Sequence, residues 1–374
     1  MISGLVSFRH FGLAQVGRLP YRRGMKAALE TTPEPNAVCD ELRKKESPEQ
    51  RLSRLRDAAL AGVGCDAEDA LWLAEEAGEK ELIEAACAVR EAFFGNKAEL
   101  CSIINAKSGK CDMNCTFCSQ SRYNCTEIEE YPMMPAEELE ERIHNIIDGE
   151  QRLCGVVTSG GRLSPKEVKE LAKVVKKIGG GKPAPVCGSL GRLAAADLRE
   201  LKEAGITRLH HNLEASENYY PNICTTQTWQ QRLATVRAAL ESGLELCCGG
   251  LFGLGESWQD RVDLASELRS IGITSVPINF LYSHEGTPLA GRSPLSPSEA
   301  LRVIAVYRFM LPKATLRICG GRTHVLKDRQ AELFAAGANG LMTGNYLTVS
   351  GKVPDEDLAM LNELGLEIEK TCFA

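Results

Sequence analysis

The sequence predicts an α/β protein, a (β/α)8 barrel of the triosephosphate isomerase type with an N-terminal helical extension. From residue 100 onward, short β-rich runs alternate with helical stretches, as such a barrel requires. A chain of 374 residues with 44% hydrophobic residues can also bury one large core. Apolar residues at helical spacing fill 48–96, before the first β-rich run. A doubly wound open sheet is the alternative, because strand counts from one sequence are error-prone.

The elements follow in chain order. Within 48–96, helices are expected because Ser or Asp starts and Gly stops bracket apolar positions of period 3.6. The barrel strands are expected at 101–106, 154–159, 184–190, 206–213, 244–250, 274–280, 314–319 and 339–343. The helices between them are expected at 135–148, 164–178, 194–204, 226–242, 257–271, 296–309 and 326–336. We therefore divide the chain into 1–35, an N-terminal helical segment 36–98 and a barrel 99–370.

Residues 1–35 form a basic extension that we leave out of the fold. Their basic side chains precede the first acid, Glu30, as in a transit peptide. The favoured alternative is an upstream start codon, with Met25 as the natural beginning. Either reading predicts a segment without a fixed place in the barrel.

Charge and cysteine content narrow the function classes. A net charge of −6 without a basic stripe argues against nucleic-acid binding. No apolar run is long enough to span a membrane, and no secretory leader is visible. Fifteen cysteines in a chain of this size point to reduced thiols that bind metal or do redox chemistry, rather than to a disulfide scaffold. We therefore expect a cytoplasmic enzyme.

One loop concentrates three of these cysteines. Cys111, Cys115 and Cys118 stand at C-x3-C-x2-C spacing after the first expected strand. Barrel enzymes carry their chemistry at that end of the strands. A closed zinc site wants four protein ligands, and the fourth is missing unless Cys125 is recruited. Three thiolates instead fit a four-iron cluster that keeps one iron open for a small ligand.

This loop and four other stretches resemble the radical S-adenosylmethionine enzymes and, within them, the biotin synthase family. The stretches are CDMNCTFCSQSRY, HHNLEASENYYPNICTTQTWQQRL, GGLFGLGES, SVPINFLYSHEGTPLA and LRICGGR, within residues 100 to 367. The resemblance implies that Cys111, Cys115 and Cys118 ligate a 4Fe-4S cluster. The open iron of that cluster would bind S-adenosylmethionine and cleave it to a 5′-deoxyadenosyl radical, so no acid–base catalytic residue is expected.

The resemblance also assigns binding residues. Phe117 is the aromatic residue before the last cysteine of the loop. Asn212 and Glu214 match positions that hold the ribose hydroxyls, with Glu in place of the usual Asp. Asn279 matches a substrate contact, and His210 replaces an asparagine expected near the substrate. The glycines of GGLFGLGE would let backbone approach the adenosyl group: Gly249, Gly250, Gly253 and Gly255.

A second metal site follows from barrel geometry. Cys187, one of the neighbours Cys247 and Cys248, and Cys319 end expected strands 3, 5 and 7. Alternate strands supply the same interior layer, although buried cysteines can also be plain core residues. Arg317, two residues before Cys319, points the same way.

The family keeps an auxiliary iron–sulfur cluster in its barrel, ligated by cysteines on strands 2, 3 and 5 and an arginine on strand 7. Cys187, Cys247 and Arg317 match. The strand-2 cysteine is missing, because Val157 or Thr158 stands there and Cys154 comes too early. We expect Cys319 to compensate in a rebuilt site.

The resemblance implies sulfur insertion into dethiobiotin to give biotin, with sulfur from the auxiliary cluster. It also implies a flavodoxin- or ferredoxin-type electron donor and a homodimer. The alternative is a related radical mutase or lyase, or a hydrogenase-maturase-like enzyme, without sulfur transfer. A non-catalytic iron–sulfur protein is less favoured, because its adenosyl-binding stretches would be idle.

Overall fold

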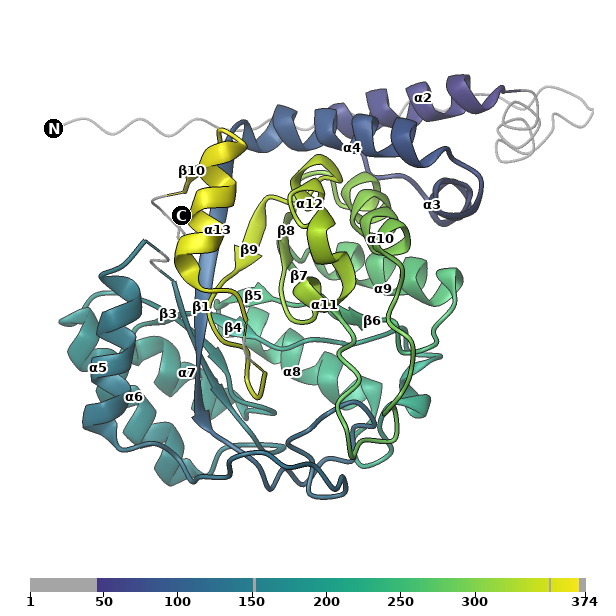
Figure 1. Ribbon diagram of the computed structural model, residues 1–374. Coiled ribbons are helices and arrows are strands. Elements are labelled where there is room, and N and C mark those ends of the chain that lie inside the picture. Colours follow the sequence, from purple (N-terminus) through teal and green to yellow (C-terminus); the bar gives the residue numbers. More distant parts are fainter. Residues whose placement is uncertain (1–45, 151–152, 350, 370–374) are drawn as a thin grey trace, which may run out of the picture. The chain divides into compact units, whose positions relative to one another are not determined.

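The structure, a computed structural model, describes residues 46–150, 153–349 and 351–369. The basic extension 1–35 and the start of segment 36–98 lie outside these residues. The described strands form one sheet that closes into a parallel barrel in the order β1-β2-β3-β4-β5-β7-β8-β9, because β9 pairs again with β1 (Figure 1). β6 pairs with β7 and continues the fifth position of the barrel, and β10 extends β1 at its start. The (β/α)8 prediction is confirmed.

The strand bounds agree closely with the expected runs. They are β1 Lys97–Lys107, β2 Cys154–Thr158, β3 Ala184–Ser189, β4 Ile206–His210, β5 Glu245–Cys247, β6 Gly250–Phe252, β7 Ser275–Phe280, β8 Thr315–Ile318, β9 Gly340–Met342 and β10 Glu367–Ile368.

Apart from the last helix, which was not expected, and the expected helix 326–336, the helices fall where their period and caps predict them. They are α2 Pro48–Leu60, α3 Ala67–Glu75, α4 Glu79–Phe94, α5 Ala136–Ile147, α6 Pro165–Gly179, α7 Ala195–Ala204, α8 Trp229–Glu241, α9 Trp258–Ile271, α10 Pro297–Met310, α11 Arg322–Leu326, α12 Glu332–Ala335 and α13 Pro354–Glu363, with 3-10 turns at Tyr220–Asn222 and Lys327–Arg329. Capping boxes fix several starts: Ser164 pairs with Glu167 at α6, and Ser257 pairs with Asp260 at α9.

Two expected elements are divided. The run 244–250 becomes β5 and β6, because the Asn212 side chain accepts the Gly249 N–H at 3.1 Å in place of a strand ladder. The same loop shortens the expected strand 206–213, which ends at His210. The expected helix 326–336 is broken into short pieces, because Lys327 adopts a positive φ of 51°.

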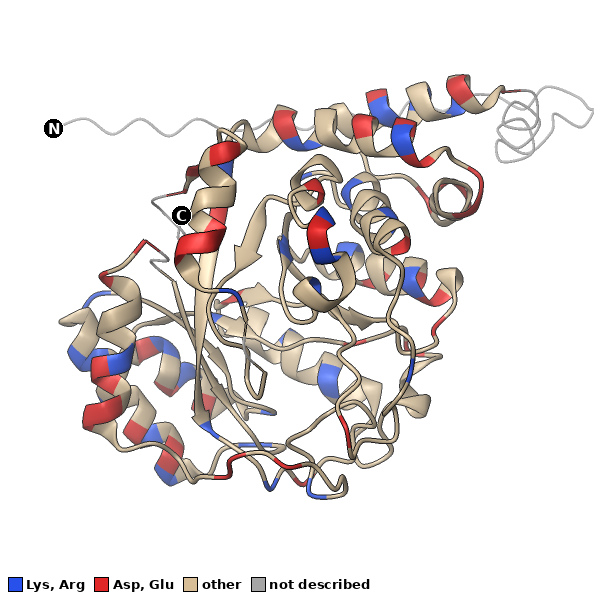
Figure 2. Cartoon of the chain, viewed as in Figure 1, with Lys and Arg blue, Asp and Glu red and all other residues tan. Residues whose placement is uncertain are grey.

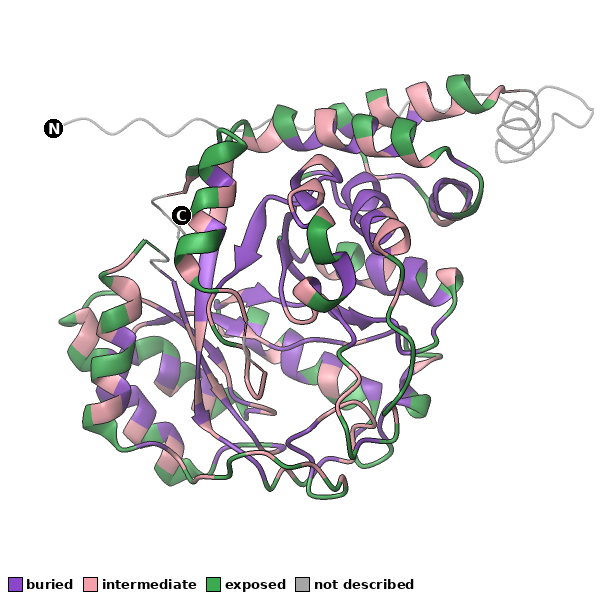
Figure 3. Ribbon diagram, in the orientation of Figure 1, coloured by how far each residue is buried: buried purple, intermediate pink, exposed green. Residues whose placement is uncertain are grey.

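The N-terminal helices pack on the side of the barrel where β1 begins (Figure 1). Arg302 of α10 donates to the carbonyls of Leu73 and Ala77, and Arg269 of α9 donates to the Cys65 carbonyl at 2.6 Å. These bonds tie the segment around α3 to the outer helices. The strands and the inward faces of the helices are buried (Figure 3), and charges of both signs are spread over the outer helices (Figure 2). Among the described helices, none has the length and apolar character needed to cross a bilayer.

Candidate active site

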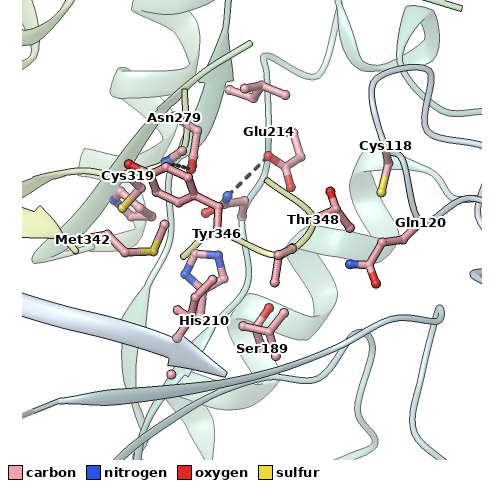
Figure 4. Close-up of a pocket in the computed structure, with 18 of the residues that line it drawn as sticks. Cys118, Gln120, Ser189, His210, Glu214, Asn279, Cys319, Met342, Tyr346 and Thr348 are labelled. Carbon is pink, nitrogen blue, oxygen red and sulfur yellow. Dashed lines mark hydrogen bonds between the residues drawn. The ribbon is translucent and has the colours of Figure 1, made fainter. Parts of the chain in front are cut away.

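A cavity of about 620 Å3 lies at the carboxyl ends of the strands. The residues that line it come from all along the barrel sequence, from Cys101 to Val349. In Figure 4, Cys118 and Cys319 lie on opposite sides of the view, with His210 and Tyr346 between them. This is the end of the barrel at which chemistry was expected.

The three cysteines of the C-x3-C-x2-C loop all line this cavity. The loop is folded by its own hydrogen bonds, since the Asn124 Nδ2 donates to the carbonyls of Cys115 and Cys118 at 3.1 and 2.8 Å. The Cys111 N–H donates to the Gln120 carbonyl at 2.9 Å. Phe117, between two of the cysteines, lines the same wall. The loop therefore presents its thiols together to the cavity.

A second segment clamps this loop from outside. The Asn114 Oδ1 accepts from the N–H groups of Thr225 and Thr226 at 2.9 and 3.1 Å, and its Nδ2 donates to the Thr225 Oγ1 at 2.7 Å. Cys224 is buried beside the loop and forms a side-chain hydrogen bond with Cys115. The stretch that contains Thr225 and Thr226 is part of the family resemblance, but its contact with the cysteine loop was not predicted from the sequence.

The thiol spacing disagrees with a zinc site. Zinc ligands at about 2.3 Å from the metal stand only about 4 Å apart. Within the described ranges, no three His, Cys, Asp or Glu side chains approach each other closely enough to hold one ion. Cys125, the possible fourth zinc ligand, is exposed and does not line the cavity. Thiolate ligands of a cluster bind different irons, so the donor set fits a cluster better than a single ion.

Burial keeps the cysteine loop protonated in the absence of metal. It raises the pKa of Cys118 to about 11 and also raises that of Cys111. The pKa of Cys115 is raised mainly by its hydrogen bond with Cys224 and then by burial. Metal binding by these thiols would release protons.

Asn212 and Glu214 lie together on the cavity wall. Glu214 has a positive φ of 70°, which is strained for a residue with a side chain. Its carboxylate accepts from the Asn212 Nδ2 at 3.3 Å and forms an ion pair with Arg232 at 3.0 Å (Glu214 is labelled in Figure 4). Arg232 also donates to the Asn212 carbonyl at 2.5 Å. Arg232, which the sequence did not single out, therefore orients both residues.

The glycines of GGLFGLGE pack closely against neighbouring backbone or adopt positive φ values. A Cβ on Gly249 would meet the Pro277 carbonyl oxygen at 2.0 Å, and one on Gly250 would meet the Glu214 carbonyl oxygen at 2.8 Å. Gly253 and Gly255 have positive φ values of 94° and 105°. None of these glycines lines the cavity. The close contacts of Gly249 and Gly250 are with neighbouring backbone, and they bring Gly250 against Glu214. An approach of this loop to the adenosyl group stays a prediction.

Asn279 and His210 both line the cavity. The Asn279 Nδ2 donates to the Gly250 carbonyl at 3.2 Å, and its Oδ1 accepts the Gly320 N–H at 3.1 Å. The Asn279 amide therefore links β7 to the backbone on both sides of it by hydrogen bonds. His210, at the end of β4, forms a side-chain hydrogen bond with Cys247.

A second group of thiols lies deeper in the barrel. Cys187, Cys247 and Cys319 line the cavity, as expected, and Cys101 of β1 joins them. Cys101, Cys187 and Cys319 pack in one buried cluster with Met342. We call Cys101, Cys187, Cys247 and Cys319 the inner thiols. Cys101 was missed in the sequence, where the first strand was expected to begin at that residue.

The structure separates the two adjacent cysteines. Cys247 faces the cavity, whereas Cys248 is fully buried in the hydrophobic core and does not line it. Cys248 is therefore removed from the set of metal-site candidates. The expected gap on β2 is present, because Gly155 and Val157 line the cavity and Cys154 is buried in the core on the other face.

Two arginines give the inner thiols a positive environment. The Arg317 Nη1 lies 3.5 Å from the Cys247 Sγ, and Arg208 lines the same part of the cavity. Burial raises the pKa of Cys101 to about 11 and raises those of Cys187 and Cys319. For Cys247 the effect of burial is outweighed by the bond from His210 and by the charges of His210, Arg317 and Arg208, so its pKa is lowered. Cys247 is the inner thiol most easily deprotonated.

Comparisons with known proteins show the family and the fold of this chain. The chain matches the Radical SAM superfamily over residues 106–268 and the Biotin and Thiamin Synthesis associated domain over residues 277–367. Solved structures share the fold. Methylornithine synthase superimposes with a TM-score of 0.70 at 21% identity, covering 84% of this chain and 97% of that one. The FeFe-hydrogenase maturase HydG from Carboxydothermus hydrogenoformans gives 0.72 at 18% identity, covering 89% and 82%.

Closer relatives share the sequence as well. The biotin synthase of Desulfovibrio desulfuricans is 53% identical over 291 residues, covering 78% of this chain and 92% of that protein. The biotin synthase of Pelotomaculum thermopropionicum is 43% identical over 310 residues, covering 82% and 97%. The matches cover nearly the whole length of both relatives. The two domain matches lie within the expected barrel, residues 99–370. The chain therefore belongs to the biotin synthase family of radical S-adenosylmethionine enzymes.

Proposed function

We propose that this protein inserts sulfur into dethiobiotin to form biotin, by radical chemistry that starts from S-adenosylmethionine. The proposal is carried by one observation: two separate sets of cysteines line the same cavity. One set is the cysteine loop, and the other is the inner thiols. A radical enzyme without sulfur transfer needs only the first group. The second set of cysteines could hold a sulfur-donating cluster in the same cavity.

The outer site would hold a 4Fe-4S cluster on Cys111, Cys115 and Cys118. When bound, that cluster supplies the electron for reductive cleavage of S-adenosylmethionine. The chain's own contribution is a fixed loop on the cavity wall, held by hydrogen bonds of Asn114 and Asn124. A flavodoxin- or ferredoxin-type protein would deliver the electron.

Asn212 and Glu214 would bind the ribose hydroxyls of S-adenosylmethionine. Arg232 holds the Glu214 carboxylate and the Asn212 backbone in one arrangement before any ligand arrives. A carboxylate so oriented accepts hydroxyl hydrogens with little further loss of side-chain entropy. The glycines would act indirectly, because they allow the backbone contacts that place Glu214.

The inner thiols would hold the auxiliary iron–sulfur cluster, the source of the inserted sulfur. No thiol of β2 reaches the cavity, but Cys101 and Cys319 together with Cys187 and Cys247 offer four sulfur ligands, so the donor set fits a cluster without a strand-2 cysteine. Dethiobiotin would lie between the two sites, beside Asn279 and His210, so that both its reacting carbons and the sulfur are enclosed. Enclosure excludes water from the radical chemistry.

The test is anaerobic turnover of the reconstituted protein with dethiobiotin, S-adenosylmethionine and a reductant, assayed for biotin and 5′-deoxyadenosine. We expect both products from the wild-type chain and neither from Cys115→Ala, in which two thiols remain in the outer site. Production of 5′-deoxyadenosine without biotin would favour a related radical enzyme without sulfur transfer. A homodimer in the cytoplasm is the expected state of the active protein.

A further inference from the structure

A carboxylate lies beneath the inner thiols, at a position the sequence did not single out. Glu99 of β1 is two residues before Cys101 and therefore shares its inward face. Both Glu99 and Arg317 pair in register with Gly340 of β9, one from each side. Gly340 has no side chain to separate them, and a Cβ there would come within 3.2 Å of the Arg317 Cβ. The two long side chains can therefore meet inside the barrel across β9.

The meeting is an ion pair in a nearly dry place. The Arg317 Nη2 donates to the Glu99 Oε2, and the Thr315 Oγ1 donates to the Glu99 Oε1 at 3.0 Å. The other end of the Arg317 fork donates to the Ser275 Oγ at 3.1 Å and approaches the Cys247 Sγ at 3.5 Å. The Arg317 side chain is only 2% exposed and that of Glu99 is 16% exposed. Both ends of the guanidinium are therefore fixed.

Glu99 also faces a second cation. The Arg208 Nη1 lies 3.9 Å from the Glu99 Oε2, and the Arg208 Nε donates to Glu245 at 3.0 Å. One partly buried carboxylate is thus shared by the two arginines that surround Cys247 and Cys187. Without it, two guanidinium groups would be held close together in a region of low dielectric, which is costly.

A charged guanidinium has five N–H donors and no acceptor, so it cannot bind iron through a lone pair. The bonds to Glu99 and Ser275 fix the direction in which the Arg317 guanidinium points its N–H groups toward Cys247. We propose that Glu99 is a positioning residue of the inner site, which holds Arg317 as a hydrogen-bond donor to Cys247 and thereby keeps it from serving as an iron ligand. The four inner thiols then supply the protein ligands alone. This inference rests on the proposed function, because it assumes a cluster on those thiols.

Two isosteric variants test the positioning role. Glu99→Gln keeps the size of the side chain and can still bond to Thr315, but it removes the charge that holds Arg317. Glu245→Gln is the matched control, because it removes an equal charge that, among the described residues, is paired with Arg208 and whose side chain is 41% exposed. Both proteins are reconstituted anaerobically, and iron loss to a chelator and the EPR spectrum of each cluster are followed.

We expect Glu99→Gln to lose the inner cluster roughly ten- to hundredfold faster and to change its spectrum, while the outer cluster is unaffected. Glu245→Gln should resemble the wild type in both. Equal behaviour of the two variants would overturn the inference and leave the proposed function intact. A wild-type chain that loads no second cluster would overturn both.

A measurement on the wild type avoids any folding defect of a variant. The protein is labelled with 15N-arginine, its auxiliary cluster is reduced, and pulsed EPR reports nitrogen coupling. We expect only the weak coupling of a hydrogen-bonded nitrogen, with none from a nitrogen bonded directly to iron. A directly bonded arginine nitrogen would show that Arg317 is a ligand and would refute the role given to Glu99.

Discussion

Cys319 is the residue on which the rebuilt inner site depends most. It follows β8, is 5% exposed, and packs against Cys101 and Cys187. No thiol is present on β2 at the cavity, where the family usually has one. The position of Cys319 among the inner thiols supports its proposed role as the compensating ligand.

Replacing Cys319 should separate radical generation from sulfur insertion. We expect Cys319→Ser to lower the iron content and to end biotin formation, while 5′-deoxyadenosine is still released, because the outer thiols are untouched. Cys248→Ala is the control, since Cys248 is buried in the core on the opposite face. If the serine variant retains its full iron content and makes biotin, Cys319 is only a packed thiol.

Glu214 is the residue whose charge should matter most for S-adenosylmethionine. Glu214→Gln leaves Arg232 without its charged partner and weakens the bonds to the ribose hydroxyls, an effect of about 1.5–3 kcal/mol. We expect roughly ten- to hundredfold weaker binding of S-adenosylmethionine, measured by equilibrium dialysis, with both clusters present. Glu217→Gln, in an exposed glutamate that does not line the cavity, should bind normally. Unchanged affinity of Glu214→Gln would remove Glu214 from the site.

At the scale of elements, the cysteine loop depends on the segment 223–227 that clamps it. Asn114 bridges the two with its amide, and the Thr116 N–H donates to the Ile223 carbonyl at 2.9 Å. The segment that precedes α8 therefore acts on the outer site without offering a ligand. These contacts give the stretch around NICTTQ, which is part of the family resemblance, a structural role in supporting the cysteine loop.

Breaking this clamp should loosen the outer site alone. Asn114→Ala removes several hydrogen bonds, each with a net value of about 1 kcal/mol. We expect iron to leave the outer cluster several-fold faster in the presence of a chelator, with the inner cluster unaffected. Tyr123→Phe is the control, because it removes only an exposed bond with Arg122. Equal rates of iron loss from the two variants would mean that the cysteine loop keeps its conformation without the contacts of Asn114.

At the scale of the whole molecule, the barrel and its catalytic end could be predicted from period, caps and strand spacing. These signals are local, so they are visible in one sequence. The choice of Cys247 over Cys248 needed the register of β5, which alternation alone leaves open. The role of the glycines needed the neighbouring strands, because Gly249 and Gly250 contact backbone that is distant in sequence.

The most informative omission is Cys101. Odd strands share an interior layer, and the argument that used strands 3, 5 and 7 applies equally to strand 1. Cys101 was overlooked because β1 begins at Lys97, which places Cys101 inside the strand rather than at its start. Glu99 and Arg208 were not predictable in the same way, because their importance comes from contacts across the barrel with Arg317.

The central claim is that the inner thiols hold the sulfur that enters biotin. It is tested most directly by reconstituting the apo-protein with iron and 34S-sulfide, removing free sulfide, and measuring the mass of biotin after one turnover with dethiobiotin. The account predicts that biotin from the wild-type chain carries the heavy isotope and that Cys319→Ser forms none. Unlabelled biotin, or no biotin despite normal 5′-deoxyadenosine release and a loaded inner site, would contradict it.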